Sequence, residues 1–174
     1  MPSGRTHDLV TILLAAPTAA AAYYVTADGT LTGIVTAATV FGGLMFGPDL
    51  DTQSYQYTRW GPFRFLWWPY KVMMPHRSSW SHGLLFSTPI RVVYFLIVAT
   101  LVLAASLYTR DAYLNGAPGN SLQLRSAFGR VWEIFVSANR SHLIAAFVGL
   151  WLGAASHTVT DFLGSLLKSA RKFI

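Results

Sequence analysis

Four long stretches without a charged residue constrain what this chain can fold into. Each stretch holds 17 to 19 residues, close to the roughly 20 residues with which a helix crosses about 30 Å of hydrocarbon. We therefore expect an all-α, multi-pass membrane protein with about four transmembrane helices. These helices are predicted at residues 9–27, 31–47, 92–109 and 143–160.

The composition favours one integral-membrane domain over residues 1–174. Only 11% of the residues are charged, against roughly 25% in soluble domains. The alternative, a soluble bundle, requires a polar helix face that the four stretches lack. The chain has no cysteine, so disulfides and thiolate metal sites are excluded. We expect no cleaved signal peptide, because Arg5, His7 and Asp8 precede the first apolar stretch without a small-residue cleavage site after it.

Basic residues predict which ends of the helices face the cytoplasm. Nine of the 13 Lys and Arg residues lie near the two termini or in the connection 48–91, and four lie in the connection 110–142. Because Lys and Arg accumulate on the cytoplasmic side of a membrane, we expect both termini and residues 48–91 there. This distribution also accounts for the net charge of +6 without a nucleic-acid partner.

The connection 48–91 contains an aromatic and basic segment. Residues 55–74 interleave eight Tyr, Trp and Phe rings with Arg and Lys, and Pro62 and Pro69 interrupt them. This composition is typical of the headgroup level of a membrane. We expect the segment to lie in the cytoplasmic interface, between the second and third transmembrane helices.

Four short groups of His and Asp residues are candidates for chemistry. His157 and Asp161 are four residues apart, so a helix projects both from one face, as two ligands of one metal ion require. The same spacing also suits a carboxylate that only fixes an imidazole tautomer, but a carboxylate within an apolar helix is costly and points to a functional site. The other groups, which could also be a helix-stop turn or interfacial side chains, are His7 with Asp8, Asp49 with Asp51, and His76 with His82.

The predicted topology, derived from Lys and Arg alone, places all four groups on the cytoplasmic face. Four imidazoles and four carboxylates are too many for one tetrahedral site and suit two metal ions that share a carboxylate. We expect one or two divalent ions, and nitrogen and oxygen donors favour zinc, with manganese or iron(II) as alternatives. Four residues of the opposite face are expected to be structural: His142, Asp28, Asp111 and Glu133.

The motifs resemble a known family in their order. They are SGRTHD, FGGLMFGPDLD, HRSSWSHG and GAASHTVTD, and they extend from residue 3 to residue 161. The set looks like the uncharacterised metal-binding membrane proteins named domain of unknown function 2227. It is also similar to the YdjM-like predicted membrane-bound metal-dependent hydrolases. The resemblance implies metal binding by His7, Asp8, Asp49, Asp51, His76, His82, His157 and Asp161.

The function expected from such a site is hydrolysis of a phosphoester, which could be a lipid, at the cytoplasmic membrane face. Two metal ions activate water and hold the attacking and leaving oxygens, with Asp8 or Asp161 as general base. Arg77 could hold a phosphate oxygen or be a snorkelling interfacial cation. The alternative is a non-catalytic metal-binding membrane scaffold or assembly factor. Ion transport is disfavoured, because the second and third stretches offer only Thr, Ser and Gly along the bilayer depth.

Overall fold

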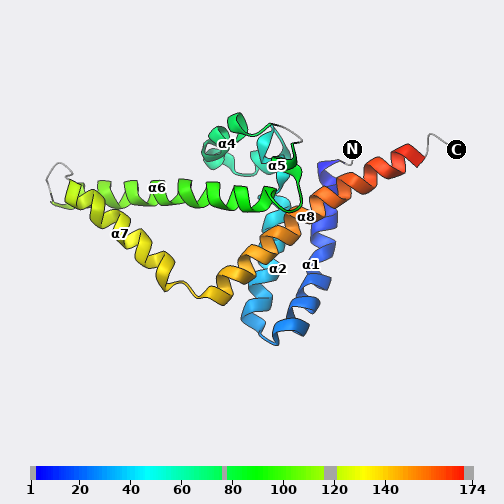
Figure 1. Cartoon of the computed structure of the whole chain (residues 1–174), viewed down its shortest axis with the longest axis horizontal. Helices are drawn as coiled ribbons and strands as arrows, with labels where there is room; N and C mark the ends of the chain where they lie inside the picture. Colours follow the sequence, from blue (N-terminus) through cyan, green and yellow to red (C-terminus); the bar gives the residue numbers. More distant parts are fainter. Residues whose placement is uncertain (1–2, 76–77, 116–120, 171–174) are drawn as a thin grey trace. The chain divides into compact units, whose positions relative to one another are not determined.

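A computed structural model describes residues 3–75, 78–115 and 121–170 of the chain (Figure 1). All regular structure in these ranges is helical, which confirms the all-α prediction. The chain forms two compact units, one of residues 1–91 with 140–174 and the other of residues 92–139.

Eight α-helices and two 3₁₀ helices follow one another within the described residues. They are α1 (Gly4–Thr26), α2 (Gly29–Leu44), η1 (Pro48–Asp51), α3 (Tyr55–Thr58), η2 (Gly61–Trp67), α4 (Trp68–Met73), α5 (Ser79–His82), α6 (Ser87–Asn115), α7 (Ser121–Ser137) and α8 (Arg140–Ala170). Helices α1, α6 and α8 are long and apolar enough to cross a membrane. Helix α2 is apolar but has only 16 residues, about 24 Å at 1.5 Å per residue. Three of the four predicted spans therefore have the necessary length.

A tight turn joins α1 to α2. The backbone N–H groups of Thr30 and Leu31 donate to Asp28 Oδ1, at 2.7 and 2.9 Å. This carboxylate caps the first turn of α2, where the N–H groups have no partner within the helix. Asp28 thus has the structural role predicted for it.

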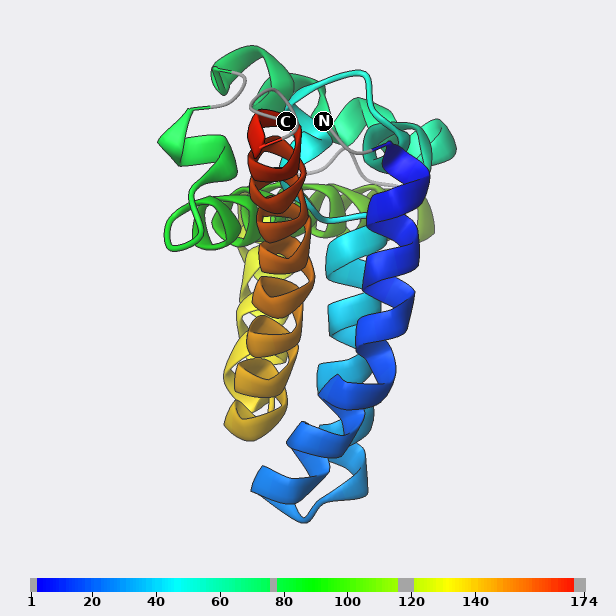
Figure 2. The same ribbon diagram turned by 90° about the vertical axis from the view of Figure 1, so that its right-hand side faces the viewer.

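Small residues allow α1, α2 and α8 to pack side by side (Figure 2). A Cβ atom at Gly153 of α8 would lie 2.2 Å from the carbonyl oxygen of Thr39 in α2, a separation that no side chain tolerates. A Cβ at Gly43 of α2 would lie 2.3 Å from the Thr11 hydroxyl oxygen of α1. Both contacts lie one helical turn from a candidate ligand, because Gly153 precedes His157 and Thr11 follows His7 by four residues.

The connection between α2 and α6 has a core of its own. Trp67 and Tyr70 are fully buried, and the Trp67 ring lies 5.3 Å from the Phe46 ring and 5.7 Å from the Tyr70 ring in edge-to-face contact. Other rings of the same segment are exposed, among them Phe63 and Trp68. Part of the segment predicted to lie in the membrane interface is therefore buried inside the protein, and the interfacial placement of its exposed rings stays a prediction.

In the second unit, Asp111 of α6 has a structural role, as predicted. Its Oδ2 accepts a hydrogen bond from an Arg130 guanidinium nitrogen of α7 at 2.6 Å, and Arg110 lies 3.5 Å from its Oδ1. Ala104, Ala127 and Val131 are buried in this unit. The ion pair and the small apolar contact fix α7 against the end of α6.

Candidate metal centre

His7, His157 and Asp161 form the centre of the candidate site. One ligand atom from each lies within 4.8 Å of the others. The Nε2 atom of His7 is 3.3 Å from Asp161 Oδ1, and the Nε2 atom of His157 is 3.8 Å from Asp161 Oδ2. Tetrahedral zinc with bonds of about 2.1 Å separates its ligand atoms by roughly 3.4 Å. A small contraction would therefore bring these three groups onto one ion.

The two imidazoles of this centre are stacked and buried. Their centroids are 3.7 Å apart with an angle of 11° between the rings. His7 is 6% exposed and His157 is 3% exposed. Two positively charged rings would repel strongly at this distance.

Asp49 connects this centre to a second group of donors. Its Oδ2 is 3.3 Å from His157 Nε2, and its Oδ1 is 3.4 Å from His82 Nε2. His82 in turn presents Nδ1 at 3.8 Å from Oδ2 of Asp51, whose side chain is fully buried. Six of the eight predicted ligands thus form one continuous chain of contacts: His7, Asp161, His157, Asp49, His82 and Asp51.

The electrostatic surroundings keep Asp49 ionised. Burial raises the pKa of its carboxyl group, but the neighbouring side chains of His157 and His82 outweigh this effect and hold the pKa well below its usual range. Asp49 is therefore a carboxylate at neutral pH, which is the form that coordinates a cation.

Gln56 of α3 hydrogen-bonds groups on two segments of the site. Its Nε2 donates to the carbonyl oxygen of Gly43 at 2.7 Å and lies 3.3 Å from His157 Nδ1. Its Oε1 accepts from the backbone N–H of Asp49 at 3.1 Å. One buried amide thus fixes both the His157 ring and the Asp49 backbone, as the outer partners of metal ligands do. Sequence reasoning missed Gln56.

Asp8 is engaged by Arg59. A guanidinium nitrogen of Arg59 donates to Asp8 Oδ1 at 2.9 Å, the second nitrogen contacts Oδ2, and Arg59 also donates to the Leu44 carbonyl oxygen. The Asp8 carboxylate accordingly raises the pKa of Arg59. Asp8 fastens α1 to the segment after α2, and its predicted role as ligand or base stays a prediction.

Two further predicted site residues, His76 and Arg77, lie outside the described residues. Their assignments as metal ligand and phosphate-binding cation remain predictions.

A buried arginine adjoins the second group of donors. Arg91, near the start of α6, is fully buried and donates to the hydroxyl groups of Ser87 and Thr88, at 3.4 and 3.2 Å. Its charge also interacts with the Tyr70 hydroxyl and with the carboxylates of Asp51 and Asp49. From the sequence, Arg91 is predicted only to mark the cytoplasmic side of the membrane. The signal in the sequence that could have indicated its burial is its position directly before a charge-free stretch.

The donor set fits a divalent metal ion. Within the part of the chain that the structure describes, His157 Nε2 is buried without a hydrogen bond of normal geometry, and carboxylate oxygens of Asp49 and Asp161 lie 3.3 and 3.8 Å from it. Buried polar atoms are almost always hydrogen-bonded, so a ring nitrogen of this kind beside two carboxylates is expected of a cation site. Nitrogen and oxygen donors without sulfur suit zinc, manganese or iron(II).

Comparison with known proteins identifies a family. A family profile described as "Uncharacterized metal-binding protein (DUF2227)" matches residues 2–171. No curated protein and no solved structure matches the chain. The matched range contains all of the His and Asp residues that form the candidate centre.

Proposed function

Because the chain belongs to the DUF2227 family of uncharacterised metal-binding proteins, we propose that it is a membrane-embedded metalloprotein that hydrolyses a phosphoester at the cytoplasmic face. Family membership confirms the resemblance inferred from the four motifs. The reaction, the cytoplasmic orientation and the identity of the metal are the proposed part.

The position of Asp49 carries this proposal. Its two carboxylate oxygens face different imidazoles, those of His82 and His157, as expected for a carboxylate shared between two ions. Three imidazoles and three carboxylates also exceed the three or four protein ligands of one zinc ion. Two closely spaced metal ions are the usual arrangement in enzymes that cleave phosphoesters.

Each residue of the chain of contacts has a role in this proposal. His7, His157 and Asp161 would hold one ion, Nε2 of His82 would bind a second, and Asp49 would be shared. Asp51 contacts the other ring nitrogen of His82, Nδ1, and would orient that ring. When bound, the ions would supply Lewis-acid polarisation of a phosphoryl oxygen. The two carboxylate oxygens of Asp161 face different imidazoles; one would bind the ion, and the other is our candidate for accepting the proton of an attacking water.

Exposed apolar side chains support the membrane placement. Leu13 and Val25 of α1 are 65% and 80% exposed, and Ile144 of α8 is 64% exposed. Apolar surface of this extent on helices of spanning length is expected of lipid contact. The excess of Lys and Arg in the segments beside the metal centre supports its placement on the cytoplasmic side.

A second candidate function is a non-catalytic scaffold whose metal ion holds the helices together. The burial of His7 and His157 favours it, because buried ligands leave little room for a substrate. A metal shell closed by protein ligands indicates a structural site, whereas an open position indicates catalysis.

Metal analysis combined with a hydrolysis assay tests both functions. The protein in lipid nanodiscs would be assayed for bound metal by mass spectrometry and for cleavage of bis(p-nitrophenyl) phosphate and phosphatidylglycerol. We expect the parent protein to bind stoichiometric metal and to cleave the ester. Cleavage should fall about 10²-fold to 10⁴-fold in Asp161→Asn. Glu133→Gln, an exposed carboxylate of α7, is the control and should retain both.

The outcomes separate the two functions. Bound metal without cleavage of either ester would favour the scaffold, and the absence of metal from the parent protein would contradict both functions.

A further inference from the structure

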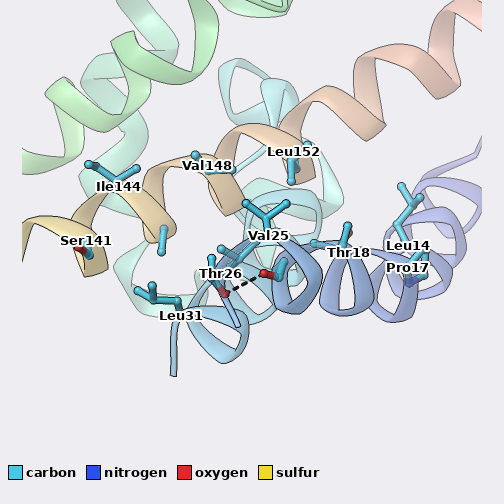
Figure 3. Close-up of a pocket in the computed structure, with 14 residues that line it drawn as sticks. Leu14, Pro17, Thr18, Val25, Thr26, Leu31, Ser141, Ile144, Val148 and Leu152 are labelled. Carbon is cyan, nitrogen blue, oxygen red and sulfur yellow. Dashed lines mark hydrogen bonds between the residues drawn. The ribbon is translucent and has the colours of Figure 1, made fainter. Parts of the chain in front are cut away.

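An apolar groove of about 630 Å³ lies between α1, α2 and α8 (Figure 3). Its walls include Leu14 and Val25 of α1 and Ile144, Val148 and Leu152 of α8. Its polar groups are hydroxyls, and that of Thr26 already donates to the Ala22 carbonyl oxygen at 2.8 Å. The walls therefore offer an apolar ligand a surface without charge.

The groove and the metal centre lie at opposite ends of one helical seam. On α8, residues at steps of four lie in one row, and this row begins with Ser141 and Ala145 in the groove and ends with His157 and Asp161. On α1, the groove begins at Leu14, about 10 Å along the axis from His7, and ends at Thr26. The groove is therefore a site distinct from the metal centre.

The length of the groove matches one leaflet of a bilayer. From Leu14 to Thr26 the helix rises about 18 Å, and half of the hydrocarbon core is about 15 Å. Leu14 lies near the middle of α1 and Thr26 at its end. In a membrane spanned by α1, the groove extends from the midplane to the interface on the side of the α1–α2 turn.

A positive charge lies where this groove reaches the interface. Arg140 begins α8, is exposed and adjoins Ser141, which lines the groove. Among the described residues no carboxylate forms an ion pair with Arg140, and the Asp28 carboxylate of the nearby turn caps α2. Its charge is complementary to a lipid phosphate, which resides at this level of a bilayer.

We propose that the groove binds one acyl chain of a phospholipid from the leaflet on the side of the α1–α2 turn, with the lipid phosphate at Arg140. The uncharged walls and the positive charge at the interface end of the groove match the apolar chain and the anionic phosphate of one lipid. The inference rests on the proposed membrane placement and is independent of the metal and of hydrolysis.

Photolabelling with a lipid tests the site. The probe is phosphatidylglycerol with a diazirine in its acyl chain, incorporated in nanodiscs of phosphatidylethanolamine and phosphatidylglycerol that contain the full chain. Labelled peptides, identified by mass spectrometry, should concentrate at residues 14–26 and 141–152. Ala21 lines the groove and Ala20 does not, so Ala21→Trp should reduce this labelling about tenfold, while Ala20→Trp leaves it unchanged.

Arg140→Gln provides a second and independent variant, which adds no bulk to the helix packing. Removing one cation beside anionic lipid should lower the labelling about fivefold, which corresponds to the roughly 1 kcal/mol of such a contact. Equal labelling of the parent and of both Ala21→Trp and Arg140→Gln would overturn the proposal.

Two further outcomes would overturn the proposal in recognisable ways. The native chain has no cysteine, so Val148→Cys can report what lies beside the groove. A disulfide from this position to a cysteine introduced in α6, or to a second copy of the chain, would show that a helix fills the groove. Release of the chain from membranes by alkaline carbonate would overturn the membrane placement itself. Retention in the membrane with uniform labelling of all exposed apolar surface would overturn the groove site alone.

Discussion

At the scale of single residues, the candidate centre depends most on His157. Its Nε2 is 3.3 Å from Asp49, its ring stacks on His7 and its Nδ1 lies 3.3 Å from the Gln56 amide. Truncation to alanine removes a ligand, and Asp49 and Asp161 each lose one of their two neighbouring imidazoles, which is costly for a carboxylate beside a membrane. Substituting a residue that hydrogen-bonds a metal ligand typically lowers metal affinity roughly 10-fold to 100-fold. We expect a larger loss in His157→Ala, seen as a lower content of bound metal by mass spectrometry.

His142 is the matched control for this experiment. It lies on the same helix, 15 residues before His157, a distance of about 22 Å along the axis. His142→Ala should therefore bind metal like the parent. Equal metal content in the parent and His157→Ala would contradict the ligand assignment, and loss of metal from His142→Ala would contradict the location of the site.

Asp8 gives a second test at this scale. The structure pairs its carboxylate with Arg59, whereas the sequence predicts a ligand. If the ion pair is its role, Asp8→Asn and Arg59→Gln should each retain metal and destabilise the fold by up to about 1 kcal/mol, as partly exposed pairs do. Metal analysis and thermal unfolding would measure this. Loss of metal from Asp8→Asn but not from Arg59→Gln would support the original prediction.

His7 and Asp8 also show what a motif can predict about a site. Both belong to one motif, yet adjacent residues on a helix point about 100° apart, so one approaches His157 and the other Arg59. Chemistry and order along the chain identified six residues that do meet. Gln56 and Arg91 were missed, because their part in the site depends on packing between segments that are distant in sequence.

At the scale of helices, the glycine contacts between α2 and α8 determine how closely the ligands approach. A methyl group at Gly153 would meet the Thr39 carbonyl oxygen, so Gly153→Ala must move one helix. We expect a destabilisation of about 1–3 kcal/mol with weaker metal binding, measured by thermal unfolding and metal analysis. Gly33→Ala of α2 meets nothing within 4 Å and should stabilise the helix by roughly 0.5–1 kcal/mol. Equal effects of the two changes would contradict this packing.

Helix positions were predictable because apolar composition and length persist over many residues. The charge-free stretches predicted α1, α6 and α8, although their ends extend beyond the stretches because helices continue into polar sequence. The connection after α2 was less predictable. Its aromatic composition indicates an interface, but only tertiary packing decides that Trp67 and Tyr70 turn inward while Trp68 turns outward.

At the scale of the whole molecule, the length of α2 bears on where the metal centre lies in a membrane. Its 16 residues cover about 24 Å from the α1–α2 turn, less than the hydrocarbon thickness of about 30 Å. Asp49 and Asp51 follow its end by only a few residues. If the turn lies at one interface, the carboxylates lie close to the other, with the bilayer thinned or the polar segment drawn inward to offset the difference.

Cysteine labelling tests this orientation on the native background, which contains no cysteine. We expect Thr30→Cys, in the first turn of α2, to react with an impermeant maleimide added to intact cells. Thr58→Cys, at the end of α3, should react only after lysis, because the basic segments favour the cytoplasmic side. Labelling of both from outside would contradict the crossing of α2. The reverse pattern would place the metal centre on the outer face, where the proposed hydrolase would meet extracellular substrates.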